Sequence, residues 1–193
     1  MRTPKPPLPP KPPKRPAKAD ALPALLREAI GLHQAGQAQR ADALYARILK
    51  RAPDQPDALH LSGLLRYQAG DLAKAEALIR RALSFNPSAA SYHNSLGVVA
   101  LAQGRAEEAR AHFAAALERD ASYAQALNNL GNALQALGRF SEAVEAYKRA
   151  LALNPADADQ LSNLGRALQA LNRPADATHA FRRALALKPA SAT

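Results

Sequence analysis

The sequence contains five histidines and several paired acids, the residue types that acid–base catalysis and metal binding would use. The histidines are His33, His60, His93, His112 and His179. No two of them are three or four residues apart, so one helix face cannot present a paired metal site. The pairs Glu107–Glu108 and Glu142–Glu145 lie where helices are expected to begin, and acids at that place complement the helix dipole. The sequence also has no cysteine, no phosphate-cradling glycine loop and no nucleophile elbow. We therefore predict that the chain is not an enzyme and uses no metal or other cofactor.

The small residues of the chain repeat every 34 residues. The segment Gly-Asn-Ala-Leu-Gln-Ala-Leu-Gly at 131–138 aligns with Gly-Arg-Ala-Leu-Gln-Ala-Leu-Asn at 165–172. Continued without insertions, this spacing divides the chain into five units, which are 22–55, 56–89, 90–123, 124–157 and 158–191. The twentieth residue of every unit is alanine and the twenty-eighth is leucine. Such a fixed period predicts an array of similar structural units.

Eight of the nine glycines fall at two positions of this repeat. The eighth position holds Gly63, Gly97, Gly131 and Gly165, and the fifteenth holds Gly36, Gly70, Gly104 and Gly138. Glycine inside a helix costs about 1 kcal/mol relative to alanine, so its recurrence predicts two backbones that cross closely. We expect the alanine at the twentieth position to be the other side of that crossing. Glycine at the fifteenth position, or Asn172 in the last unit, is expected to end a helix in the left-handed conformation.

Further positions complete the pattern. The seventh and eighth residues are commonly Leu-Gly, the twenty-seventh is commonly alanine, the thirty-second is commonly proline, and the twenty-fourth is aromatic in Tyr45, Phe113, Tyr147 and Phe181. This pattern resembles the tetratricopeptide repeat (TPR). The resemblance covers 22–191 and implies an all-α fold, a right-handed solenoid of five helix-turn-helix repeats. The first two units depart from it at Glu28 and Ala29 and at Ser62 and Arg66. We expect these units to be the loosest, or their faces to meet another surface.

The first 21 residues form a segment of different composition. Residues 1–20 contain eight of the fifteen prolines, six Lys or Arg and one acid, which gives half of the net charge of +10. Proline fixes φ and lacks an amide donor, so we predict a disordered, basic tail at 1–21. It lacks the apolar run of a signal peptide, and no stretch of the chain has the ~20 apolar residues of a membrane span. We expect a cytoplasmic protein without a membrane partner.

The resemblance implies that the first helices of successive units line a concave groove. Its expected peptide-binding residues in units three to five are Asn94, Ser95, Asn128, Asn129, Asn132, Gln135, Ser162, Asn163, Arg166 and Gln169. Side-chain amides and hydroxyls both donate and accept hydrogen bonds, so such a row can pair with an extended backbone. In units one and two the same positions include Leu61, Leu64 and Tyr67, which could hold apolar side chains of a ligand or pack against the tail. We predict a non-catalytic scaffold that binds a protein or peptide partner.

Three alternatives concern partners. Asn129 and Asn163 match an asparagine ladder, and these repeats look like those of bacterial O-linked N-acetylglucosamine transferase-like proteins. The chain could be a detached or truncated substrate-recognition region of such a protein.

The basic tail could bind nucleic acid or another anionic surface, although it has no aromatic residue for base stacking. Leu164, Leu168, Phe181 and Leu185 are expected to have no following unit to cover them, which predicts self-association through the last repeat.

Overall fold

The structure is a computed structural model that describes residues 21–188. Within that range the chain is all-α, as predicted, with ten helices, short connections and no strand. The helices are α1 (Ala21–Gln34), α2 (Ala38–Arg51), α3 (Pro56–Gln68), α4 (Leu72–Phe85), α5 (Ala90–Ala102), α6 (Ala106–Arg119), α7 (Ala124–Ala136), α8 (Phe140–Leu153), α9 (Ala158–Ala170) and α10 (Pro174–Leu187). Among them, none is long and apolar enough to cross a membrane. The predicted tail, apart from its last residue, and residues 189–193 lie outside the described residues.

The turn inside each helix pair depends on one residue in the left-handed conformation. Gly36, Gly70, Gly104 and Gly138 have φ values between 71° and 80°. After α9, Asn172 takes the same place with φ of 54°. Glycine adopts this conformation without a steric penalty and asparagine tolerates it, so the turn residues stop each first helix. The helix-ending role predicted for the fifteenth position is confirmed.

The glycines inside the first helices bring each of these helices close to its partner. A Cβ atom placed on Gly131 in α7 would lie 2.5 Å from Cε1 of Tyr147 in α8. A Cβ on Gly97 in α5 would lie equally close to Cε1 of Phe113 in α6. Atoms in protein interiors do not overlap in this way, so the ring occupies the space that a side chain at the glycine would need.

The partner of this crossing differs from the prediction. The expected partner was the alanine at the twentieth position, but the atoms nearest to Gly97 and Gly131 all belong to the aromatic ring at the twenty-fourth position. Near Gly63, Ile79 Cγ1 at 2.6 Å is closer than the carbonyl oxygen of Ala75 at 3.2 Å. The nearest partner differs because a long side chain reaches across the interface, whereas the alanine brings its backbone close, as the carbonyl oxygen of Ala75 does beside Gly63.

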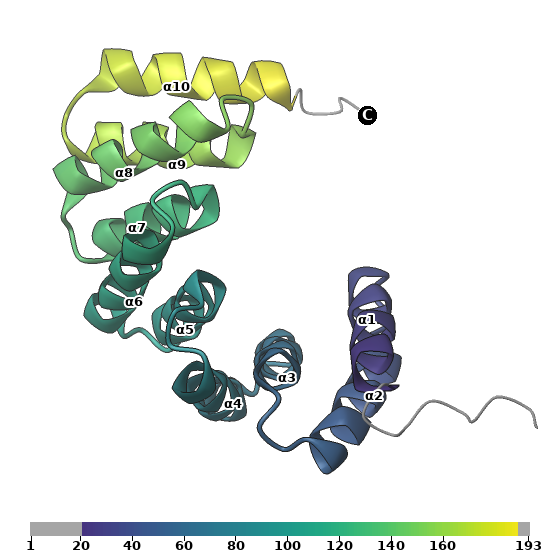
Figure 1. Ribbon diagram of the computed structural model, residues 1–193. Coiled ribbons are helices and arrows are strands. Elements are labelled where there is room, and N and C mark those ends of the chain that lie inside the picture. Colours follow the sequence, from purple (N-terminus) through teal and green to yellow (C-terminus); the bar gives the residue numbers. More distant parts are fainter. Residues whose placement is uncertain (1–20, 189–193) are drawn as a thin grey trace, which may run out of the picture.

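The pairs stack so that every second helix also packs on the next first helix. Thus α2 contacts α3, α4 contacts α5, α6 contacts α7 and α8 contacts α9. The first helices additionally contact one another, since α3 meets α5, α5 meets α7 and α7 meets α9. Figure 1 shows the resulting open arc, with the odd-numbered helices along its inner edge and the even-numbered helices along its outer edge. Side chains of the odd-numbered helices therefore form the inner face.

In the last helix pair, the apolar side chains of α9 are more buried than predicted. Leu164 and Leu168 of α9 are 9% and 4% exposed, and they join a buried cluster built from α7, α8, α9 and α10. The prediction that they lack cover was wrong because α9 packs between α8 and α10. Leu185 of α10, by contrast, is 60% exposed, whereas Leu151 at the same position of α8 is 8% exposed.

The close crossing leads to a stability prediction. We expect Gly131→Ala to lower the free energy of unfolding by about 1–3 kcal/mol, because the added methyl group overlaps the Tyr147 ring and overpacks the interface. Gly31→Ala is the matched control, since Gly31 lies inside α1 and an added Cβ would meet no atom within 4 Å. That change should instead raise stability by up to about 1 kcal/mol through helix propensity. Urea unfolding followed by circular dichroism measures both, and equal effects would contradict the crossing.

Candidate functional site

The ten residues predicted to bind a peptide all come from helices of the inner edge. Asn94 and Ser95 lie on α5; Asn128, Asn129, Asn132 and Gln135 lie on α7; Ser162, Asn163, Arg166 and Gln169 lie on α9. Because α5 contacts α7 and α7 contacts α9, the three helices bring these side chains into one row. These three helices lie along the inner edge of the arc in Figure 1.

The amides of this row bond to one another across the helices. Asn129 donates from Nδ2 to Oδ1 of Asn94 at 3.0 Å. One pair further, Asn163 donates from Nδ2 to Oδ1 of Asn132 at 3.2 Å, and the guanidinium of Arg166 donates to Oδ1 of Asn163. Amides can form such links and still bond a ligand, because each carries two N–H donors and an oxygen with two lone pairs. The row is therefore held in place before any ligand arrives.

The exposure of the row changes along it. Asn94 and Ser95 are 4% and 7% exposed and form the floor at the α5 end. The six residues on α7 and at the start of α9 are half-buried, and Arg166 and Gln169 are exposed. The hydroxyl of Ser162 already donates to the carbonyl oxygen of Ala158 at 2.9 Å. The half-buried asparagines of α7 and α9 thus offer the best combination of access and fixed position.

Tyr147, the aromatic residue at the twenty-fourth position of its repeat, supports the row. Its hydroxyl donates to Oδ1 of Asn132 at 2.7 Å and lies 3.3 Å from Oε1 of Gln135. The ring is fully buried against Gly131. A tyrosine rather than a phenylalanine at this repeat position was the available signal, since a buried hydroxyl needs a partner. Tyr147 orients two amides of the row from below.

A pocket of about 290 Å³ opens where α3, α5 and the start of α7 meet on the inner face. Leu64 and Tyr67 of α3, Val98 of α5 and Tyr123 form much of its wall. The apolar inner positions noted for the second unit therefore line a concave surface. The pocket also includes Asn94, so it adjoins the amide row.

His60 lies at the base of this pocket. Its Nε2 is 2.8 Å from Oγ of Ser95, and its ring centroid lies 4.4 Å from that of Tyr92. Tyr92 in turn donates its hydroxyl to Asp57 at 2.5 Å. Burial lowers the pKa of His60 to about 4, with the negative charge of Asp57 opposing that shift. His60 is consequently neutral at pH 7.

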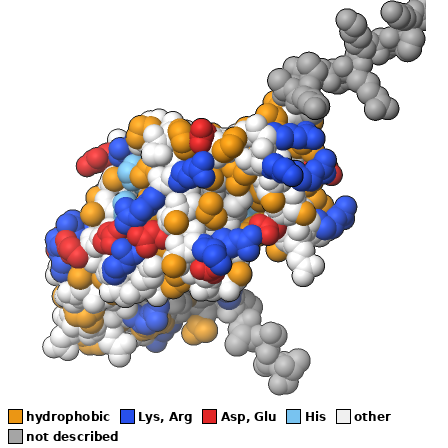
Figure 2. All heavy atoms as spheres, turned by 90° about the horizontal axis from the view of Figure 1, so that it is seen from below, with side chains coloured by type: hydrophobic (Ala, Val, Ile, Leu, Met, Phe, Trp, Pro, Cys, Tyr) orange, Lys and Arg blue, Asp and Glu red, His pale blue; other side chains and the backbone are white. Residues whose placement is uncertain are grey.

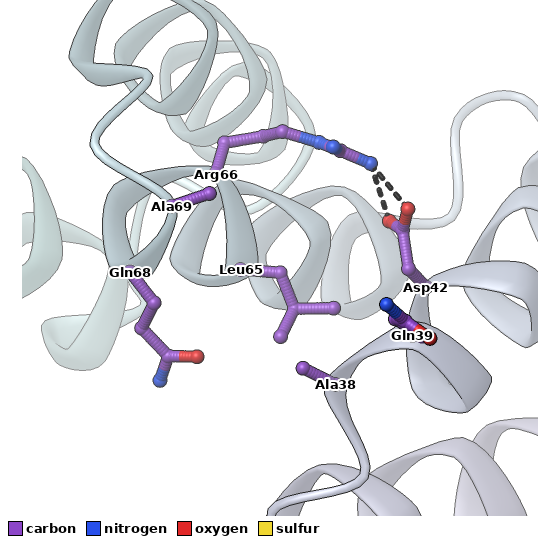
Figure 3. Close-up of a pocket in the computed structure, with 7 residues that line it drawn as sticks. All are labelled: Ala38, Gln39, Asp42, Leu65, Arg66, Gln68 and Ala69. Atoms are coloured by element: carbon purple, nitrogen blue, oxygen red, sulfur yellow. Dashed lines mark hydrogen bonds and ion pairs between the residues drawn. The ribbon is translucent and has the colours of Figure 1, made fainter.

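A second pocket, of about 280 Å³, lies between α2 and α3 (Figure 3). Arg66, which stands at a usually apolar repeat position, donates from one guanidinium nitrogen to both carboxylate oxygens of Asp42, at 2.6 and 2.5 Å. Figure 3 shows this ion pair crossing from α3 to α2 above Leu65. The departure from the repeat pattern at Arg66 is thus accommodated by an acid on the neighbouring helix.

Comparison with known families defines these repeats. Three family models, each described as tetratricopeptide repeat, match residues 32–97, 87–156 and 128–192. The chain contains tetratricopeptide repeats. The three matches overlap, and together they extend from α1 past the end of α10.

Solved TPR structures share the fold at low sequence identity. A crystal structure of MamA is 19% identical, with a TM-score of 0.73, over 89% of this chain and 93% of that chain. MamA from Desulfovibrio magneticus RS-1 is 18% identical, with a TM-score of 0.78, over 92% of this chain and 100% of that chain. YrrB, described as a TPR protein with an unusual peptide-binding site, is 18% identical, with a TM-score of 0.71, over 90% of each chain. No curated protein matches this sequence. At these identities the likeness establishes the fold alone.

Charged side chains of the TPR array pair with one another on the second helices and the connections next to them. Arg80 and Arg105 both contact Glu76, at 2.8 and 2.5 Å, and both contact Glu108 at 2.5 Å. Arg81 pairs with Asp54 at 3.0 Å. Figure 2 shows basic side chains interspersed with acidic ones over the face it presents. The adjacent basic residues Arg80 and Arg81 are thus both engaged by acids.

The remaining histidines lie apart from the amide row. The ring centroids of His93 on α5 and His112 on α6 are 5.9 Å apart. Nδ1 of His33 lies 3.4 Å from the hydroxyl of Tyr45. Burial lowers the pKa of all three. Across residues 21–188, no group of three potential metal ligands comes together.

The burial of His60 leads to a pH prediction. Between pH 6.5 and pH 4 the unfolded chain protonates this histidine while the folded chain does not, so stability falls as the pH is lowered through that range. The loss should reach about 3 kcal/mol. His60→Gln should remove this part of the pH dependence, measured by urea unfolding at several pH values. His179→Gln, at an exposed histidine of α10, is the control. If both variants show the same pH dependence, His60 does not carry the effect.

Proposed function

We propose that the inner face of this TPR array binds an extended segment of a partner protein along α5, α7 and α9. The supporting observation is the row of side-chain amides, which recurs on three consecutive first helices and is pre-positioned by its own hydrogen bonds. An extended backbone presents alternating N–H and C=O groups, and amides can bond both. The chain then acts as a non-catalytic interaction scaffold of five 34-residue units over 22–191.

The hydrogen bonds within the row leave it able to bind a ligand. Among the described residues, the bonds formed by Asn129 and Asn163 use one N–H of each amide. The second N–H of each amide and the Oδ1 of Asn129 remain for a partner. Pre-positioned side chains lose less rotamer entropy on binding than mobile ones, which favours affinity. YrrB, a structural neighbour described as having a peptide-binding site, supports the same use of the fold.

A ladder of asparagines is also compatible with the transferase-like alternative. In that case the chain would present substrate segments to a separate catalytic protein, and the same two asparagines would hold the substrate backbone. Both versions require binding of an extended segment on the inner face, so the same variants test them. The mixed charges on the face shown in Figure 2 provide no comparable support for nucleic-acid binding.

The exposed end of α10 favours a second kind of partner, which is another copy of this chain. Leu185 and half-buried Phe181, with Ala184, line a depression of about 350 Å³. The corresponding face of α8 is buried under α9, as the 8% exposure of Leu151 shows. Covering Leu185 would remove apolar surface from water, which favours association.

The groove proposal predicts a loss of binding in two asparagine variants. Peptides selected from a random display library against the full chain serve as the probe. Asn129→Ala and Asn163→Ala should each weaken the best peptide by about 5- to 20-fold, because each removes hydrogen bonds to its backbone. Isothermal titration calorimetry measures the affinity, and thermal unfolding confirms that both variants fold. Asn154→Ala, at an exposed asparagine after α8, is the matched control. Wild-type affinity in both groove variants would refute the groove.

The self-association proposal predicts a concentration-dependent mass. Sedimentation equilibrium of the full chain should show dimers or larger species at high micromolar concentration, and Leu185→Glu should shift the equilibrium to monomer by placing a charge on the apolar face. Leu153→Glu, at the 48%-exposed leucine that ends α8, is the control. A wild-type chain that stays monomeric across the range, or a Leu185→Glu variant that associates as wild type, would overturn the proposal.

A further inference from the structure

The pocket between α3, α5 and α7 has walls and a base of uncharged side chains. Leu64, Val98 and the rings of Tyr67 and Tyr123 form the walls. The base is His60 with Ser95, which are 7% exposed each and bonded to one another at 2.8 Å. Nε2 of His60 and Oγ of Ser95 are therefore already paired with one another, and a ligand group that enters need not satisfy these two atoms.

We propose that this pocket seats one large uncharged side chain, aromatic or aliphatic, from the same partner segment whose backbone lies along the amide row. The inference rests on the proposed function and adds the chemistry of the partner. It predicts a segment with an anchor residue such as Phe, Tyr, Leu or Met at one position and free backbone groups next to it.

The size of the pocket matches a single anchor. Sites that hold a whole small-molecule ligand usually measure about 300–1,000 Å³. At about 290 Å³ this pocket lies at the lower limit of that range. The pocket is thus suited to one bulky side chain of the partner, whose backbone remains outside the pocket. Buried anchor residues in protein interfaces are held in this way.

Charge selects the kind of side chain. His60 is neutral at pH 7, so neither wall nor base offers a charge to an entering Lys, Arg, Asp or Glu. Removing such a group from water without an opposite charge carries a large penalty, whereas an apolar side chain gains from leaving water. The aromatic residues Tyr67 and Tyr123 in the lining additionally favour an aromatic or methyl-rich partner. The pocket therefore discriminates against charged anchors.

The position of the pocket connects it to the amide row. Asn94 lines the pocket, and its Oδ1 accepts the hydrogen bond from Asn129. A segment that bonds Asn129 thus passes the pocket mouth, and a side chain one or two residues along can turn into it. The pocket would therefore hold the anchor side chain of the partner, while the adjoining amide row bonds the backbone next to it.

The inference is tested with peptides selected from a random display library against the full chain. We expect the enriched peptides to share one position rich in Phe, Tyr, Leu or Met. Leu64→Asp places a carboxylate in the pocket wall at a half-buried site and should weaken the best peptide by at least about tenfold. Replacing the anchor of the peptide by alanine should weaken binding to the wild-type chain but cause little further loss in Leu64→Asp.

Two controls separate a binding effect from misfolding. Leu153→Asp makes the same change at a 48%-exposed leucine on α8 and should bind as wild type. Gln125→Trp, at an exposed residue that lines the pocket, should obstruct the mouth without altering the core and should weaken binding similarly. Thermal unfolding verifies each variant, and Gln125→Trp decides the matter if Leu64→Asp is unfolded.

The possible results are distinct. Peptides that lose affinity in Asn129→Ala but bind Leu64→Asp and Gln125→Trp as wild type would overturn the pocket assignment and leave the groove intact. A charged residue at the shared peptide position would also overturn it. Peptides that bind all of these variants equally, or no selected peptides at all, would remove the proposed function together with the inference.

Discussion

The contact between a glycine backbone and an aromatic ring of the partner helix sets how closely the helices of a pair approach. In the α7–α8 pair the Tyr147 ring fills the space beside Gly131 that a side chain would otherwise occupy. The same contact that fixes the packing also fixes the site, because the ring carries its hydroxyl to Asn132 and Gln135 on the inner face. Tyr147 therefore contributes both to the packing of the α7–α8 pair and to the position of the groove amides.

The pairs vary this contact, and the variation changes what reaches the inner face. Phe113 fills the space beside Gly97 but has no hydroxyl, and the α5 positions equivalent to Asn132 and Gln135 hold the apolar Val98 and Leu101. The α5 amide of Asn94 is bonded by Asn129 of the next pair. In the first pair, fully buried Ala29 stands where the others have glycine, and the Tyr45 hydroxyl approaches His33. A single repeat position thus supports different polar partners, depending on whether its ring ends in a hydroxyl.

The 34-residue period was enough to predict the helical class, the turn residues with positive φ and the helices that carry the amide row. Each of these depends on short-range geometry, which a repeat displays directly. The closest partner of the inner glycines was not predictable in this way, since it depends on how far a ring reaches across an interface. The burial of Leu164 and Leu168 was likewise missed, because the pattern along one helix does not show that two neighbours cover it.

For the candidate site, the period identified residue types and helix faces but not the bonds between them. Asn94 and Asn129 are 35 residues apart, as are His60 and Ser95. Such pairs lie close to the repeat length, so adjacent repeats place them side by side. The sequence nevertheless could not show that Ser95 would bond a histidine rather than extend the amide row. Its partner comes from the fifth repeat position of the preceding first helix, where His60 stands instead of an asparagine.

The distribution of charge in the described structure indicates what the inner face can recognise. Arg80 and Arg105 are held by acids on second helices, while nine of the ten residues of the candidate row are uncharged and Arg166 bonds Asn163. A neutral surface attracts partners weakly at long range, so selectivity must come from fit, hydrogen bonding and desolvation at contact. An amide row contributes little sequence information because every residue has the same backbone. In the proposed mode of binding, the adjoining pocket would supply the selectivity that the amide row lacks, because it contacts a side chain of the bound segment.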